Sequence, residues 1–125
     1  YSLPFEDNSF DFVWSRFLFE YLLDPVMALQ EMKRVTKKNG IVAVGDLDGN
    51  CIFHYPMAEE FEHRLDTLIK ILKPFGFDPF VGRKLFYYMN QAGFPKVDVK
   101  MYPYHNIYGD IEKINRRKKG RKFKS

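Results

Sequence analysis

The stretch DLDGN at residues 46–50 places oxygen-bearing side chains at alternate positions, as a calcium-binding loop does. Such a loop also needs a glycine at its sixth position and a bidentate glutamate at its twelfth. Counted from the first aspartate, the twelfth position is Met57. Counted from Asp48 it is Glu59, but Phe53 then takes the glycine position. Both registers fail, so no calcium site is predicted.

Cys51 and His54 are separated as a pair of zinc ligands would be. No second pair completes a set of four ligands, because Cys51 is the only cysteine, and no metal site is predicted. A hydrolase is not indicated either, since the sequence contains no nucleophile-elbow motif. A single cysteine excludes an intramolecular disulfide and fits a reducing, cytoplasmic setting.

The elements that precede these residues are typical of a parallel α/β sheet. Residues 10–14 (FDFVW) are rich in β-formers, and their near-continuous hydrophobicity predicts a strand covered on both faces. Asp24-Pro25 predicts the capped start of a helix. Residues 41–46 (IVAVGD) predict a second buried strand. Together they predict a right-handed crossover unit joining parallel strands.

The first helix is expected to run to about Thr36, with Asn39-Gly40 as its C-terminal cap. A longer amphipathic helix is expected from Met57 to about Lys73, stopped by Pro74 and Gly76. The remaining expected elements are a helix over 83–92, with Leu85, Phe86 and Met89 inward and Gly93 as cap, and an edge strand over 97–101.

Three groups of motifs, in this order, resemble a class I S-adenosylmethionine-dependent methyltransferase of the type 11/25-like kind. The first comprises Leu3-Pro4-Phe5, Phe10-Asp11-Phe12-Val13 and Asp24-Pro25, and is similar to the family's fourth strand with its flanking loop and helix. The second comprises Ala28-Leu29, Glu31, Arg34-Val35 and Lys38-Asn39-Gly40, and is similar to the turn into strand five. The third comprises Gly82-Arg83-Lys84-Leu85 and Gln91-Ala92-Gly93-Phe94, and is similar to the segment before strand six.

The resemblance covers about residues 2–101 and implies a partial Rossmann-like fold, with strands four to six and their helices. The family binds its cofactor mainly through a glycine-rich turn after strand one and an acid ending strand two. None of the eight glycines here is spaced as G-x-G. The expectation is therefore the C-terminal half of a methyltransferase domain at 1–109, incomplete and inactive alone, with its cofactor half absent. An intact small protein adapted from such a half is the alternative.

The resemblance implies that S-adenosyl-L-methionine is the cofactor, and that four retained residues line it. Leu3 follows the loop that lies against the adenine. Ser15, Arg16 and Phe17 end strand four, where open α/β sheets place their ligands, and in the family this segment lines the methionine moiety. For Arg16, a surface ion pair is the competing interpretation.

Methyl transfer also requires a base when the acceptor is a hydroxyl or an acidic carbon. Glu20, Asp46 and His54 are the candidates, although local packing is the favoured interpretation of Glu20-Tyr21. A small-molecule acceptor is expected. Neither the acceptor nor the methylated atom follows from the sequence, because part of the pocket is missing.

The basic charge is confined to the C-terminal tail. Residues 115–125 carry seven Lys and Arg and no acid, while the rest of the chain has 13 basic against 16 acidic residues. Residues 110–125 are expected to be a flexible basic tail. The alternative function is a non-catalytic binding module that uses this tail for nucleic acid or anionic surfaces. Nucleic acid is disfavoured, because only Phe123 could stack on bases.

No apolar run approaches the roughly 20 residues that span a bilayer, so no membrane insertion is expected. The strand at 10–14 would pair with strand one in the family. Without that strand its edge should be exposed and apolar, and able to pair with a second copy of the chain. Self-association through this edge is therefore expected.

Overall fold

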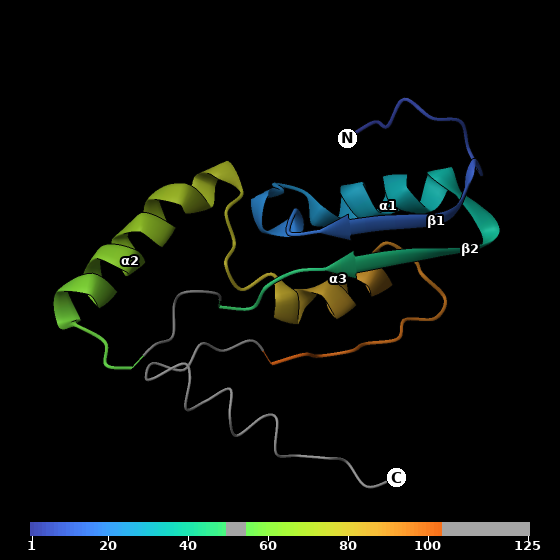
Figure 1. Ribbon diagram of the computed structural model, residues 1–125. Coiled ribbons are helices and arrows are strands. Elements are labelled where there is room, and N and C mark those ends of the chain that lie inside the picture. The colour runs from blue at the N-terminus through green and yellow to red at the C-terminus, as the bar shows by residue number, and fades with distance from the viewer. Residues whose placement is uncertain (50–54, 104–125) are drawn as a thin grey trace, which may run out of the picture.

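The computed structural model describes residues 1–49 and 55–103, and the described part is an α/β structure (Figure 1). Its regular elements, in chain order, are β1 (Phe10–Arg16), α1 (Pro25–Val35), β2 (Thr36–Gly45), α2 (Glu59–Leu72) and α3 (Leu85–Gln91). Short 3₁₀ turns lie at Phe19–Tyr21, Lys73–Phe75 and Gly82–Lys84. The predicted α/β class is confirmed.

The two strands pair in parallel, as the crossover prediction requires. Five consecutive pairs, from Phe12 with Ile41 to Arg16 with Gly45, keep one register, so both strands end at the same edge. Helix α1 connects them. Its start is the predicted one, because the Asp24 carboxylate accepts a hydrogen bond from the Met27 amide at 2.8 Å and Pro25 is the first helical residue.

The end of α1 differs from the prediction. The helix ends at Val35, close to the expected Thr36, but Asn39-Gly40 is not its cap. Strand β2 begins directly at Thr36, which pairs with Phe10, and the register then shifts before Ile41. A Cβ at Gly40 would lie 2.6 Å from the Thr36 side chain and 2.8 Å from the Asp11 carbonyl oxygen. Gly40 is therefore needed for a close approach of two chain segments.

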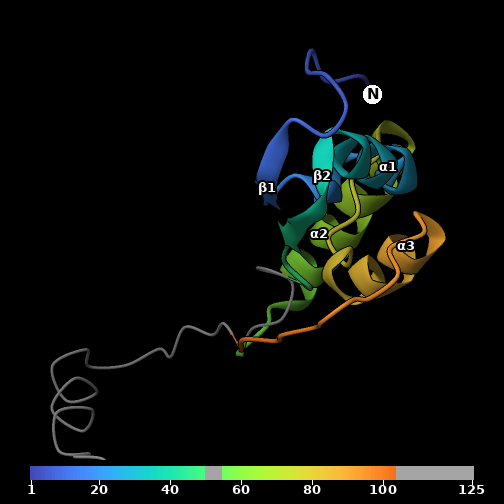
Figure 2. The ribbon, with the colours of Figure 1, turned by 90° about the vertical axis from the view of Figure 1, so that its right-hand side faces the viewer.

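The core lies on one side of the sheet. Buried residues of α1, α3 and the intervening segments form one cluster: Phe19, Leu29, Met32, Val81, Met89 and Ala92. Val13, Val42 and Val44 pack against it from the strands. Figure 2 shows α1 and α3 on the same side of β1 and β2.

The other face of the sheet is open. Phe12, Trp14 and Ile41 are all more than half exposed. The prediction that residues 10–14 are covered on both faces is thus wrong for the described chain. The hydrophobic run correctly indicated a strand, but no described element packs on its second face.

Helix α2 confirms the predicted amphipathic helix but buries none of its residues. It projects away from the strands (Figure 1). Gly76, in the left-handed conformation at φ 94°, ends the segment as predicted. Helix α3 also ends as predicted, at a left-handed Gly93. Its Met89 is buried, whereas Phe86 is 52% exposed and does not point inward as expected.

The expected strand over 97–101 is not formed. An isolated strand leaves its backbone groups without partners, and in the described chain only β1 and β2 pair. Val97 nevertheless packs against the core cluster. The proposed basic tail lies outside the described residues. None of the helices in the described ranges is long and apolar enough to cross a membrane.

Candidate functional site

The carboxyl ends of β1 and β2 bring several of the predicted site residues together. Arg16 pairs with Gly45, so Phe17 and Asp46, which follow the two strands, leave the sheet side by side. The Phe17 amide continues the ladder by donating to the Gly45 carbonyl oxygen at 3.0 Å. Asp46 therefore lies beside the turn formed by residues 17–19.

Asp46 ties the ends of both strands together. Its Oδ2 accepts hydrogen bonds from the Leu18 amide at 3.1 Å and the Phe19 amide at 2.8 Å. Its Oδ1 accepts one from the Leu47 amide at 2.8 Å. Both carboxylate oxygens are thus engaged by backbone N–H groups.

Arg16 and Phe17 form an exposed pair at this edge. The guanidinium carbon of Arg16 lies 4.4 Å from the centre of the Phe17 ring, a cation–π distance. Phe17 has a left-handed backbone, with φ 53°. Arg16 makes no ion pair with any residue in 1–49 or 55–103. Just before them, the Ser15 hydroxyl is buried and has no hydrogen-bond partner among the described residues.

Glu20 and Tyr21 face the same region from the following 3₁₀ turn. Glu20 is buried, and its carbonyl oxygen accepts a hydrogen bond from the Asp78 amide at 2.8 Å. A hydrogen bond to Glu20 and the charge of its carboxylate raise the pKa of Tyr21, and burial and the nearby Asp46 raise it further. Glu20, Tyr21 and Asp46 therefore belong to one electrostatic cluster.

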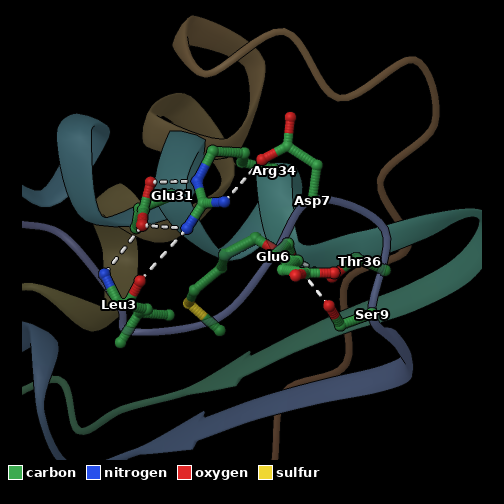
Figure 3. A network of polar contacts seen from close by, with 8 residues as sticks. Leu3, Glu6, Asp7, Ser9, Glu31, Arg34 and Thr36 are labelled. Carbon is green, nitrogen blue, oxygen red and sulfur yellow. Dashed lines mark hydrogen bonds and ion pairs between the residues drawn. The ribbon is translucent and has the colours of Figure 1, made fainter.

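Leu3 lies elsewhere, on the surface of α1. Its amide donates to the Glu31 carboxylate at 2.7 Å, and its carbonyl oxygen accepts from Arg34 at 3.2 Å (Figure 3). Arg34 also bonds both oxygens of Glu31 and reaches Asp7. The hydrogen bond from Arg34 and the one from the Leu3 amide lower the pKa of Glu31 to about 2. This network anchors the N-terminal segment along α1, and it does not join Leu3 to Arg16 or Phe17.

The segment 78–82 also reaches the strand ends, which the sequence reasoning did not assign to the site. The Gly82 amide donates to the Leu47 carbonyl oxygen at 3.0 Å, and the Gly49 amide donates to that of Pro79 at 2.8 Å. A Cβ at Gly82 would lie 2.8 Å from the Leu47 oxygen. The signal was Gly82 itself, whose lack of a side chain permits this approach.

His54 and the Cys51–His54 pair lie outside the described residues. In the part of the chain that the structure describes, no group of three or more His, Cys, Asp or Glu side chains could hold a metal ion. The site therefore consists of the strand-end residues and Asp46, with Glu20 and Tyr21 beside them.

Two comparisons with known proteins relate the sequence of this chain to one family. Residues 1–44 match the family model described as a methyltransferase domain. Over 88 residues the chain is 41% identical to the uncharacterized methyltransferase C1B3.06c of Schizosaccharomyces pombe, an alignment that covers 68% of this chain. The aligned part spans only 30% of that relative. The family match and this identity both support a class I methyltransferase-like domain in this chain.

Proposed function

We propose that this chain forms part of an S-adenosylmethionine-dependent methyltransferase that acts on a small-molecule acceptor. One observation carries the proposal: residues 1–44, which the methyltransferase family model matches, form most of a parallel strand–helix–strand unit that has the exposed Arg16 and the Asp46 carboxylate at its carboxyl edge. Open α/β sheets bind their ligands at that edge. The glycine-rich turn that such enzymes use would be supplied from outside residues 1–125.

The residues at the edge fit one end of such a cofactor. Arg16 is an exposed cation without an ionic partner in the described chain, and the amino-acid end of S-adenosylmethionine carries a carboxylate. A guanidinium binds a carboxylate through paired, charge-assisted hydrogen bonds. The Ser15 hydroxyl, in the residue before Arg16, is buried and has no hydrogen-bond partner among the described residues, so it is a further polar group at this strand end. When bound, S-adenosylmethionine supplies a methyl group activated by its sulfonium.

Of the three candidate bases, Glu20 and Asp46 lie in the described part of the chain, and either could take a proton from the acceptor. Glu20 directly follows the turn at residues 17–19, and its carboxylate neighbours the Tyr21 hydroxyl, whose pKa it raises. Asp46 has both oxygens bonded to backbone amides, and it would have to release one of them to accept a proton. We therefore assign the proton acceptor to Glu20 where the acceptor atom needs one.

Titration calorimetry of the purified chain tests the assignment of Arg16. We expect weak, millimolar binding of S-adenosylmethionine that is lost in Arg16→Ala. Adenosine, which lacks the carboxylate, should bind the two proteins equally. Arg64→Ala is the matched control, because Arg64 is an exposed arginine of α2 that pairs with Glu60.

Two results would contradict the proposal. If Arg16→Ala and Arg64→Ala weaken binding equally, or if the chain does not bind at all, Arg16 does not hold the cofactor. Micromolar affinity of the unaltered chain would instead contradict the expectation that the main cofactor turn comes from outside residues 1–125.

A further inference from the structure

Two of the three hydrogen bonds of Asp46 join segments that are far apart in the sequence, and the third comes from the next residue, Leu47. The first two come from Leu18 and Phe19, which follow β1, whereas Leu47 follows β2. Hydrogen bonds from backbone amides to an ionised carboxylate are stronger than those between neutral groups. The carboxylate therefore acts as a clamp across the two strand ends.

The clamped segment has a backbone conformation that its sequence does not favour. Phe17 is left-handed at φ 53°, a region that aromatic residues rarely occupy. Residues held in such regions persist only where the surroundings fix them, and they cluster at functional sites. The hydrogen bonds to Asp46 begin at the next residue, Leu18, so they hold the turn immediately after Phe17.

This turn determines which side chains face solvent and which face the core. Phe17 is exposed and lies under the Arg16 guanidinium, whereas Phe19 is almost fully buried and Glu20 is buried beside it. Without the left-handed step at Phe17, the chain would leave β1 in another direction. The stacking of Arg16 on Phe17 therefore depends on the turn.

We propose that Asp46 is a positioning residue, which holds the turn at residues 17–19 and so places the Arg16–Phe17 pair at the edge of the sheet. This inference rests on the proposed function for its meaning, because the pair is the group assigned to the cofactor. It also removes Asp46 from the candidate bases. The clamp itself is a property of the free chain.

Amide hydrogen exchange and proton NMR of the free chain test the clamp without any cofactor. In Asp46→Ala we expect exchange at the Leu18 and Phe19 amides to accelerate by about tenfold or more, because their acceptor is gone. We expect the Phe17 ring to shift the Arg16 side-chain protons upfield in the unaltered chain, and these protons to return to the positions of a free arginine in Asp46→Ala. Asp48→Asn is the matched control, since its carboxylate lies two residues on and pairs with Arg83 instead.

Each outcome decides the matter. Unchanged exchange at the Leu18 and Phe19 amides in Asp46→Ala would overturn the clamp. If exchange accelerates in Asp46→Ala but the Arg16 proton resonances stay where they are in the unaltered chain, Asp46 holds the backbone but does not position the Arg16–Phe17 pair. None of these readouts involves S-adenosylmethionine, so their failure is distinguishable from failure of the calorimetric test of the function.

Discussion

Helices α1 and α2 both have an apolar stripe, yet only one of them is covered. Helix α1 buries Leu29, Met32 and Val35 against the sheet and α3. Helix α2 buries no residue and leaves Phe61, Leu68 and Ile71 about half exposed. Hydrophobic periodicity thus predicts a helix and its apolar face, but it does not specify what packs against that face.

The two helices also differ in how their N-terminal ends are stabilised. Helix α1 starts at a side-chain cap, whereas Ala58 gives α2 none. Helix α2 relies on exposed i,i+4 ion pairs, Arg64 with Glu60 and Lys70 with Asp66, which contribute little to stability. We therefore expect α2 to open more readily than the β1–α1–β2 unit.

Matched leucine truncations give the largest contrast between the helices. Leu29 is fully buried, so Leu29→Ala should lower the free energy of unfolding by about 2–5 kcal/mol, through lost burial and the cavity left behind. Leu68 is 49% exposed, and Leu68→Ala should cost less than about 1 kcal/mol. Urea denaturation measures both. Equal losses would mean that α2 is covered in solution.

The junction of α1 and β2 provides the next contrast. A Cβ at Gly40 would collide with Thr36 and Asp11, so Gly40→Ala should cost about 1–3 kcal/mol. Nothing lies within 4 Å of a Cβ at Gly45, so Gly45→Ala should change stability by less than about 0.5 kcal/mol. Thermal unfolding compares the two. A tolerated Gly40→Ala would show that the register shift near Thr36 is absent in solution.

Removing the cap of α1 and adding one to α2 should make the stabilities of the two helices more alike. Asp24→Ala removes the hydrogen bond to the Met27 amide and should cost about 1 kcal/mol. Ala58→Ser supplies α2 with a cap and should stabilise it by up to about 1 kcal/mol. Hydrogen exchange along each helix reports the change. If Ala58→Ser leaves exchange in α2 unchanged, its fraying does not begin at that end.

The pH dependence of hydrogen exchange should distinguish the N-terminal segment, which Glu31 of α1 holds, from the surface ion pairs of α2. The folded-state pKa of Glu31 is about 2, below its ordinary value of 4.5. Its stabilising contribution is therefore fully present above about pH 4.5 and is lost as the pH falls through about 2. Exchange at the Leu3 amide should accelerate over that range beyond its intrinsic pH dependence. Glu31→Gln should abolish the effect, and Glu60→Gln should leave it. Persistence in Glu31→Gln would assign it to another group.

The sequence predicted helix ends correctly where residues next to the end determine them. Asp24-Pro25, Gly76 and Gly93 mark helix ends through side-chain capping and left-handed backbone. Asn39-Gly40 misled, because pairing of Thr36 with Phe10 overrides a plausible cap. Residues 97–101 alternate as a strand would, but alternation does not provide a partner strand.

For the candidate site, the sequence predicted which residues stand at the strand ends but not the contacts that they make. The sequence placed Ser15, Arg16 and Phe17 at the end of one expected strand and Asp46 at the end of the next, and the parallel register brings them together. The hydrogen bonds of Asp46 could not be predicted, since they depend on the left-handed turn at Phe17. The contacts made by Leu3 and by 78–82 depend on packing between distant segments, which spacing alone does not encode.

An NMR titration of the isotope-labelled chain with S-adenosylmethionine, followed at every backbone amide, tests the central claim most directly. If the carboxyl ends of β1 and β2 meet the methyl donor, amides at 15–20 and at Asp46 should shift progressively up to millimolar ligand. Those of α2 should stay in place and serve as the internal reference. Shifts concentrated on α2, or none at 15–20, would contradict the account.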